Sequence, residues 1–283
     1  NRYHLFDAER DRRARIHREL LGRIRRGWLD GEFCLYFQPK VDMRQGRVIG
    51  VEALARWRHP EQGVLPPAAF IGAVEDSDFS MNFSSWVLET AIRQMATWHG
   101  AGLVLPVSVN LSARHLQQPD FATQIQSLLA HYSYVRSNWL EIEVLETTAL
   151  DETQRVFHII SECRELGVRF AIDDFGTGYS SLTYLKHLPA QILKIDRSFI
   201  RDMLFDPGDL AIVRGIIGLS SAFKLDVIAE GVASVEHGAR LLELGCDHAQ
   251  GYAIARPMPA GEVLDWMRGW RKPAAWNGVN ERV

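Results

Sequence analysis

Two adjacent carboxylates, Asp173 and Asp174, end the apolar run in VRFAIDDFGTGYSSL, residues 168–182. Neighbouring anions about 4 Å apart repel by about 1 kcal/mol in water and by roughly 4 kcal/mol at an effective dielectric of 20. A helix cap or a turn would account for a lone DDFG segment. If the pair lies in a cleft, a divalent cation would compensate the repulsion, and paired cations assist phosphoryl transfer.

Polar residues also end other apolar runs along the chain. Side chains alternate across a strand, so the large apolar residues of VRFAID share one face. The same alternation places a polar residue opposite the apolar face in VIGVEAL, LPVSVN, LEIEV, ILKID and DVIAE. The six residues on the polar face are Glu52, Asn110, Glu143, Asp173, Lys194 and Glu230.

The charges of this set do not balance. Together with Asp174 it holds five carboxylates and one amide against a single lysine. Each residue alone could be a satisfied polar group at a strand end, but burying unpaired charges costs several kcal/mol each. Six in succession favour one or two divalent cations, and oxygen ligands suit magnesium, manganese or calcium better than zinc. We expect Asp173 to be a strand-end ligand and Asp174, as the first loop residue, to turn toward a second ion.

The elements that position these residues alternate between strands and helices. The strand candidates are 33–38, 48–54, 103–110, 139–145, 168–173, 191–196, 224–230 and a weaker one near 246–250. The helical stretches are 84–100, 119–132, 152–166, 209–222, 234–244 and 260–270. The alternation predicts βαβ units, a parallel sheet and an α/β fold of the (β/α)8 barrel type, with a doubly wound open sheet as the alternative. In a barrel, the six polar residues would point inward at the carboxyl end, where barrel active sites are built.

The composition excludes several other classes of protein. The chain has 283 residues, 47% hydrophobic and 24% charged, with a net charge of −3, so nothing indicates a nucleic-acid polymer as partner. Cys34, Cys163 and Cys246 are isolated, which speaks against a zinc or disulfide framework. No apolar run reaches membrane-spanning length, so we expect no membrane contact within this chain and a cytoplasmic location, although a longer parent protein could carry an anchor.

The N-terminal segment 8–28 is expected to be a helix. Ile16, Leu20 and Ile24 recur on one face, and the other faces are crowded with arginine. Acidic residues are interleaved among the arginines, which favours a solvated connecting helix over a nucleic-acid arm.

Eight ordered motifs give the chain a specific resemblance. They are YFQP at 36–39, VEALARW at 51–57, VNLSARHL at 109–116, LEIEVLETTAL at 140–150, IDDFGTGYSSL at 172–182, LKIDRSFI at 193–200, IAEGVA at 228–233 and QGYAIARP at 250–257. Over roughly residues 30–272 the chain resembles the EAL domain family. The resemblance implies a modified TIM-like barrel and a bacterial phosphodiesterase that hydrolyses cyclic di-GMP to linear 5'-pGpG with two divalent metals, Mg²⁺ or Mn²⁺. Ca²⁺ is expected to inhibit, because its larger and looser coordination shell fits a tight two-metal geometry poorly.

The resemblance also implies roles for individual residues. The metal ligands would be Glu52, Asn110, Glu143, Asp173, Asp174 and Glu230, with Asp173 bridging both ions. The catalytic residues would be Lys194, which contacts the attacking water, together with Glu230 and Glu52. The substrate contacts would be Gln38, Leu54, Arg56, Asp174, Gln250 and Pro257. The regulatory loop at a homodimer interface would include Phe175, Gly176, Thr177, Gly178, Tyr179 and Ser180, braced by Glu146.

The resemblance divides the chain into three parts. Residues 1–29 resemble a linker helix from an upstream sensory or GGDEF module, residues 30–272 the EAL phosphodiesterase domain, and residues 273–283 a C-terminal tail. Leu145, Ala55 and Ala233 depart from the residues usual in the family, and 73–83 matches its pattern poorly. None of these departures removes a metal ligand.

Two other functions remain open at this point. A cyclic di-GMP receptor that binds without cutting would use the same cleft, although degenerate receptors typically lose the signature glutamate, an aspartate or the loop. An enolase-like barrel could use Lys194 to abstract a proton. The ten histidines form no HExxH motif, and no G-x-S-x-G, Walker or Rossmann pattern is present.

Overall fold

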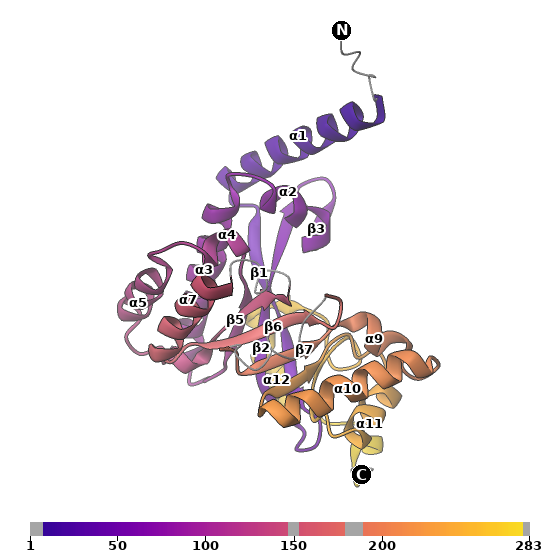
Figure 1. Ribbon diagram of the computed structural model, residues 1–283. Coiled ribbons are helices and arrows are strands. Elements are labelled where there is room, and N and C mark those ends of the chain that lie inside the picture. The colour runs from indigo at the N-terminus through magenta and orange to yellow at the C-terminus, as the bar shows by residue number, and fades with distance from the viewer. Residues whose placement is uncertain (1–7, 147–152, 179–188, 280–283) are drawn as a thin grey trace.

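The computed structural model describes residues 8–146, 153–178 and 189–279. Within these ranges, eight strands follow one another in the order β1-β9-β8-β7-β6-β5-β4-β2, and β1 also pairs with β2, so the sheet closes into a barrel (Figure 1). The closure confirms the TIM-like barrel and rules out the open sheet. The barrel strands are β1 (Phe33–Asp42), β2 (Arg47–His59), β4 (Val107–Asn110), β5 (Leu140–Leu145), β6 (Arg169–Phe175), β7 (Ile192–Ile195), β8 (Asp226–Ala229) and β9 (His248–Gln250).

The first strand departs from the expected parallel sheet. β1 runs antiparallel to both β2 and β9, whereas β2, β4, β5, β6, β7, β8 and β9 are parallel. Only the four residues 43–46 join β1 to β2. A connection this short makes a hairpin, because parallel strands need a crossover of a dozen or more residues. Short strands β3 (Gly63–Leu65) and β10 (Met258–Pro259) extend the sheet beside β2 and β1.

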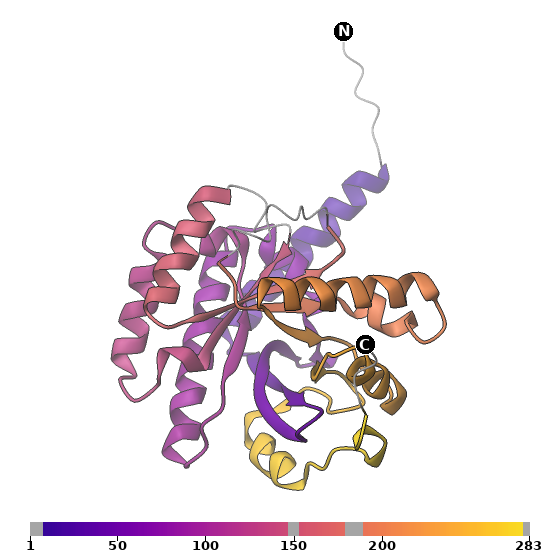
Figure 2. The same cartoon turned by 60° about the horizontal axis from the view of Figure 1, so that its bottom comes forward.

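Helices cover the outside of the strands, as Figure 2 shows. The helical patterns of the sequence predict the long helices, and the structure confirms them. They are α1 (Ala8–Leu29), α3 (Ser80–Gly100), α5 (Phe121–His131), α7 (Thr153–Glu165), α10 (Pro207–Phe223), α11 (Val235–Glu243) and α12 (Ala260–Gly269). The sequence pattern missed the short helices α2 (Ile71–Glu75), α4 (Ala113–Leu116) and α9 (Arg197–Asp202), because fewer than two turns give no clear apolar period. No helix in the described ranges is long and apolar enough to cross a membrane.

The barrel interior is layered. Ala171, Ile192 and Ile228 form a small buried apolar cluster that is separate from the main core. They lie two residues before Asp173, Lys194 and Glu230, respectively, so alternation along each strand turns all six side chains to the inside. The inward placement predicted from the sequence is therefore confirmed for Asp173, Lys194 and Glu230, and the apolar cluster supports the polar layer at the carboxyl end.

Both ends of the described chain pack on the barrel. Ile24 is fully buried, and Trp28 makes an edge contact with Phe79 at a ring centroid distance of 5.0 Å, whereas the start of α1 reaches away from the barrel (Figure 1). Trp276 is 2% exposed, and its indole N–H donates to the Val235 carbonyl at 2.9 Å. The last turns of α1 and the segment after α12 therefore both pack against the rest of the domain, the latter beside α11.

Candidate active site

Lys194 is the centre of a buried carboxylate cluster. It extends from β7 with no exposed surface, and its Nζ lies 2.6 Å from Glu143, 3.1 Å from Asp173 and 2.5 Å from Glu230. The three carboxylates come from β5, β6 and the residue directly after β8. The structure thus gathers four of the six residues predicted to share the inward face around one ammonium group.

Glu52 and Asn110 complete the same face of the site. The Asn110 amide donates to Glu52 Oε1 at 2.6 Å, and the Gln250 amide donates to Glu52 Oε2 at 2.5 Å. Gln250 also donates to Gln38, whose own amide donates to the Ala255 carbonyl. This network joins the antiparallel strand β1 to the parallel strands β2, β4 and β9. Glu52 lies in the middle of β2 and not at its end, because β2 continues to His59.

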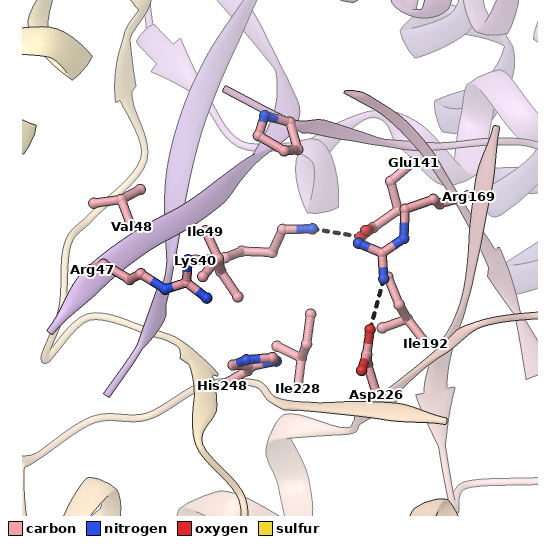
Figure 3. Close-up of a pocket in the computed structure, with 11 residues that line it drawn as sticks. Lys40, Arg47, Val48, Ile49, Glu141, Arg169, Ile192, Asp226, Ile228 and His248 are labelled. Atoms are coloured by element: carbon pink, nitrogen blue, oxygen red, sulfur yellow. Dashed lines mark hydrogen bonds and ion pairs between the residues drawn. The ribbon is translucent and has the colours of Figure 1, made fainter. Parts of the chain in front are cut away.

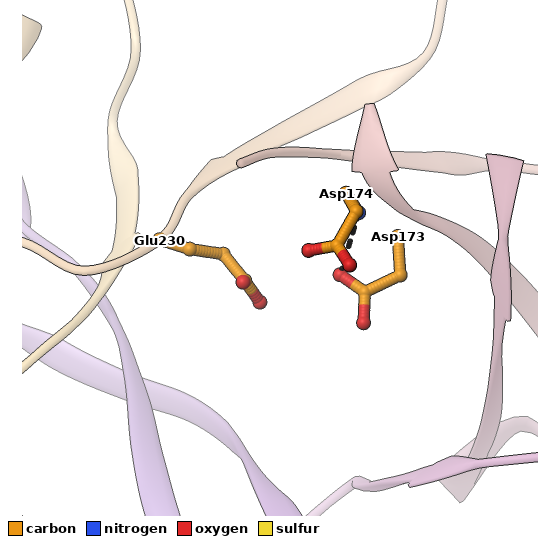
Figure 4. A group of neighbouring side chains, drawn as sticks. All are labelled: Asp173, Asp174 and Glu230. Carbon is orange, nitrogen blue, oxygen red and sulfur yellow. Dashed lines mark hydrogen bonds between the residues drawn. The ribbon is translucent and has the colours of Figure 1, made fainter. Parts of the chain in front are cut away.

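The sequence pattern predicted that Asp174 is the first residue of the loop, but the structure places it within strand β6. β6 extends through Phe175, and Asp174 has a left-handed φ of 53° at an irregularity in the pairing with β7. The left-handed conformation of Asp174 interrupts the normal alternation of side chains along β6, so Asp173 and Asp174 need not point to opposite faces of the sheet. Figure 4 shows both side chains beside Glu230, and one oxygen of each lies within 4.8 Å of those of the other two.

Burial and mutual repulsion disfavour ionised carboxylates in this cluster. Burial, followed by the charge of Glu143, raises the pKa of Glu52 to about 7. Burial and then the charge of Asp173 raise the pKa of Asp174 to about 6. Burial likewise raises the pKa of Asp173 and, further, that of Glu230. One lysine does not neutralise all of these carboxylates, so in the absence of other cations the raised pKa values favour their protonated forms.

Two neighbouring groups respond differently. Burial would raise the pKa of Glu143, but the charges of Lys194 and Lys40 lower it below its usual value. Burial would lower the pKa of Lys194, but the surrounding carboxylates raise it well above the usual value. Glu143 is therefore an anion and Lys194 a cation at neutral pH.

The donor set fits divalent cations. Oε1 of Glu143 is buried and accepts no hydrogen bond from the described residues, so an oxygen ligand is available inside the cluster. Asp173, Asp174 and Glu230 offer three more carboxylates, and Glu52 and Asn110 add a further carboxylate and an amide. An all-oxygen set of this kind suits hard divalent cations such as magnesium, manganese or calcium better than zinc.

A cleft of about 860 Å³ opens beside the cluster. All six residues predicted to contact substrate line it, namely Gln38, Leu54, Arg56, Asp174, Gln250 and Pro257. Arg197, Arg201 and Tyr252 also line the cleft, although neither the strand pattern nor the motif assignments predicted them as substrate contacts. The two arginines lie on the short helix α9. The motif LKIDRSFI, which contains Arg197, was the sequence feature that could have indicated a position near the substrate. Ala233, one of the departures from the family pattern, lies on the cleft wall.

Glu146 contacts the segment after Asp174. Its Oε2 accepts the N–H of Gly176 at 2.9 Å and that of Gly178 at 3.3 Å. A Cβ atom on Gly178 would lie only 2.7 Å from Glu146 Oε1, so a larger residue would displace the carboxylate. Gly176 has a φ of 101°, a conformation that favours glycine. Tyr179 and Ser180 lie outside the described residues.

Known proteins match this chain over most of its length. MucR of Pseudomonas aeruginosa, a bifunctional diguanylate cyclase/cyclic di-GMP phosphodiesterase, is 38% identical over 265 residues, which cover 93% of this chain and 38% of MucR. The cyclic di-GMP phosphodiesterase PdeR of Escherichia coli is 33% identical over 270 residues, 95% of this chain and 40% of PdeR. The chain thus spans about two fifths of the length of these relatives.

Solved structures agree with the sequence comparison. The structure described as PaMucR phosphodiesterase in complex with c-di-GMP has a TM-score of 0.83 at 39% identity and covers 87% of this chain and 99% of its own. An EAL enzyme in a cAMP and cyclic-di-GMP bound form has a TM-score of 0.85 at 31% identity, with 90% of this chain and 69% of its own covered. The EAL domain family profile matches residues 21–257. The chain therefore belongs to the EAL domain family.

Proposed function

We propose that this chain is a phosphodiesterase that hydrolyses cyclic di-GMP to linear 5'-pGpG with two divalent cations, Mg²⁺ or Mn²⁺. The observation that carries the proposal is the oxygen-rich cluster around Lys194, which opens onto a cleft large enough for a dinucleotide. The names of MucR and PdeR, and the ligand in the PaMucR complex, support cyclic di-GMP as the substrate.

The cluster residues would hold the cations. Glu52, Asn110 and Glu143 form one side of the ligand set, Asp174 and Glu230 form the other, and Asp173 lies between them. Two cations held there would activate water and neutralise the charge on the attacked phosphate and the leaving oxygen. Ca²⁺ is expected to inhibit, because its larger and looser coordination shell suits a tight two-ion arrangement poorly.

Lys194 and the cleft residues would orient the reactants. Lys194 is buried, and three carboxylates fix the position of its ammonium group. With cations bound to these carboxylates, the ammonium group would contact the attacking water, and Glu230 and Glu52 would complete the catalytic set. Arg56 would bind a phosphate through its planar fork, with Gln38 and Gln250 beside it. Leu54, Pro257 and Tyr252 offer apolar surfaces against which guanine bases can pack.

The chain would act as part of a larger assembly. We propose a homodimer in which the loop from Phe175 to Ser180 lies at the interface, with Glu146 bracing its start at Gly176 and Gly178. The relatives are more than twice as long as this chain, which supports a parent protein with an upstream sensory or GGDEF module joined through α1. We place the catalytic domain in the cytoplasm, where cyclic di-GMP signalling operates.

Incubation with cyclic di-GMP and Mg²⁺ or Mn²⁺, followed by chromatography of the products, tests the proposal. We expect one product, linear 5'-pGpG, and loss of hydrolysis in excess EDTA. Glu52→Gln should abolish hydrolysis, and Glu162→Gln on the solvent side of α7 is the matched control that should not. Equal activity in EDTA would overturn the metal dependence. Binding of cyclic di-GMP without any product would identify a receptor instead.

A further inference from the structure

The barrel has a second cavity at the opposite end from the candidate active site. It has a volume of about 300 Å³ and is lined at the start of several strands by Arg47, Glu141, Arg169, Asp226 and His248. Lys40, near the end of the antiparallel strand β1, also lines it because β1 runs the other way. Figure 3 shows these side chains around a common space.

This cavity is separate from the carboxylate cluster. Arg169 and Asp173 are four residues apart on β6, which corresponds to about 13 Å along a strand. Ile192 and Ile228 line the cavity and belong to the apolar layer that lies beneath Lys194 and Glu230. Lys40 connects the two sites, because its Nζ lies 3.9 Å from Oε1 of Glu143. A ligand held by Arg47, Arg169 and His248 at the cavity mouth would not contact Asp173, Lys194 or Glu230.

The two carboxylates of the cavity are already bound to cations. Lys40 Nζ lies 2.5 Å from Glu141, and both side chains are almost fully buried. Arg169 lies 2.7 Å from Asp226 nearer the surface. Among the described residues, no further carboxylate lines the cavity. Neither acidic group is thus available to hold a cation.

Basic hydrogen-bond donors remain available after this pairing. The Arg47 side chain is 63% exposed, and its nearest carboxylate, Asp42, lies 3.6 Å away, beyond normal hydrogen-bond distance. The ammonium of Lys40 has three donors and the guanidinium of Arg169 has five, so each retains N–H groups beyond those used in its ion pair. Asp42 and Glu143 also lie within 4 Å of Arg47 and Lys40, respectively, so the cavity has spare N–H donors and no excess of positive charge. His248 adds an imidazole that could donate another hydrogen bond.

We propose that this cavity binds a small oxyanion of the phosphate type. Lys40 would provide the buried positive charge at its base, while Arg47, Arg169 and His248 would donate from its mouth. A tetrahedral oxyanion can accept from several of these donors at once, and charge-assisted bonds of this kind are the strong ones. The volume lies at the lower limit of ordinary ligand pockets, which favours a small ligand over a dinucleotide.

Calorimetric titration of the chain with sodium phosphate tests the proposal directly. The buffer would contain EDTA and no phosphate, so that binding is read without hydrolysis or metal ions. We expect one phosphate per chain, with affinity that falls as sodium chloride is added. Arg47→Gln should weaken binding about tenfold or more, since it removes a charged donor. Because Arg47 is exposed, the variant should fold, and His248→Gln provides a second test at the cavity mouth.

Two controls separate this cavity from other basic sites. Arg56→Gln removes an arginine of the active-site cleft and should leave phosphate binding within twofold of the unaltered chain, as should Arg93→Gln on the surface of α3. Absence of saturable binding at tens of millimolar phosphate would overturn the proposal. Loss of binding in Arg56→Gln together with unchanged binding in Arg47→Gln would also overturn it, since phosphate would then occupy the cleft. Neither result would affect the proposed hydrolysis of cyclic di-GMP.

Discussion

The backbone N–H of Asp174 donates a hydrogen bond of 3.0 Å to Oδ1 of Asp173. With the left-handed φ of Asp174, this contact places two consecutive carboxylates on the same side of the strand. This arrangement explains how the fold accommodates two adjacent carboxylates despite their mutual repulsion. Asp173 is held by Lys194 and by the backbone, and Asp174 is released from the strand alternation and lies beside Glu230.

The two aspartates should therefore respond differently to substitution. Asp173→Asn should abolish hydrolysis and weaken the binding of both ions, because Asp173 lies centrally among the ligands. Asp174→Asn should keep one tightly bound ion and bind cyclic di-GMP, while hydrolysis falls by orders of magnitude, since water activation needs the second positive charge. Calorimetric titration with Mn²⁺ and product chromatography measure the two effects.

Asp209→Asn on α10 is a matched surface control and should leave both ion binding and hydrolysis unchanged. Near-normal hydrolysis by Asp174→Asn would contradict the two-ion account of this pair. An identical loss of metal from both variants would contradict the distinct positions that we assign to them.

Lys194→Met should lower the turnover rate by about 10²- to 10⁴-fold, the range typical of losing a positioned proton-transfer group. Cyclic di-GMP binding, measured in Ca²⁺ to suppress turnover, should change only a few-fold. The variant also leaves Glu143, Asp173 and Glu230 without their cation, so in EDTA its free energy of unfolding should fall by about 3–5 kcal/mol. Lys224→Met, near the surface end of α10, should alter neither property. A loss of binding as large as the loss of rate would assign Lys194 to substrate binding instead.

Most of the site could be predicted because it depends on strand parity. Alternation alone placed Glu143, Asp173 and Lys194 on one face, and it requires no knowledge of distant contacts. The position of Asp174 could not be derived in this way, because a left-handed residue within a strand breaks the rule on which the prediction rests. The motifs of the EAL family supplied the cleft residues, which no periodicity connects.

The polar network around Lys40 could not be predicted from the pattern. Lys40 lies on β1, and only the antiparallel hairpin with β2 brings its side chain to the opposite end of the barrel from Lys194. Strand alternation places its partner Glu141 on the same face as Glu143, but the sequence gives no means of choosing Lys40 as the ion-pair partner. Long-range pairs of this kind depend on how the barrel closes.

The stability of the chain should depend on pH through His115. The side chain is 1% exposed, with Nε2 at 2.7 Å from the Gln124 oxygen and Nδ1 at 3.0 Å from the Ser84 hydroxyl. Burial lowers its pKa below the usual value, and Asp120 is the nearby charge that opposes the shift. The folded state thus binds fewer protons than the unfolded state, so stability is retained above pH of about 6.5 and lost as the pH falls below it.

Urea denaturation at pH 8 and pH 5.5 measures this effect. His115→Gln should lose less free energy of unfolding on acidification than the unaltered chain, although it is less stable at pH 8. His131→Gln, on the exposed end of α5, is the matched control and should lose as much as the unaltered chain. Equal losses in all three proteins would show that His115 does not titrate between its folded and unfolded states in this range.

Glu146 should connect the segment at Gly176 to activity without holding metal. Its Oε2 accepts the N–H groups of Gly176 and Gly178, which begin two residues after Asp174. Glu146→Ala should release both N–H groups, loosen Asp174 through the backbone, and lower the turnover rate about tenfold or more. Glu146→Gln retains an acceptor oxygen and should lose less. Mn²⁺ affinity should stay within a few-fold in both variants, because the carboxylates of Asp173 and Glu143 are untouched.

The same variants test the proposed dimer. If the loop contributes to the interface, Glu146→Ala should shift sedimentation at tens of micromolar toward the monomer, and Glu146→Gln should shift it less. Glu89→Ala on α3, far from this segment, should change neither the oligomeric state nor the turnover rate. A fully active monomer would separate activity from dimerisation. If Glu146 only holds the segment at Gly176 and Gly178, Glu143, Asp173 and Lys194 stay in position in Glu146→Ala. A loss of metal from Glu146→Ala as large as that from Asp173→Asn would instead show that Glu146 helps to hold the ions.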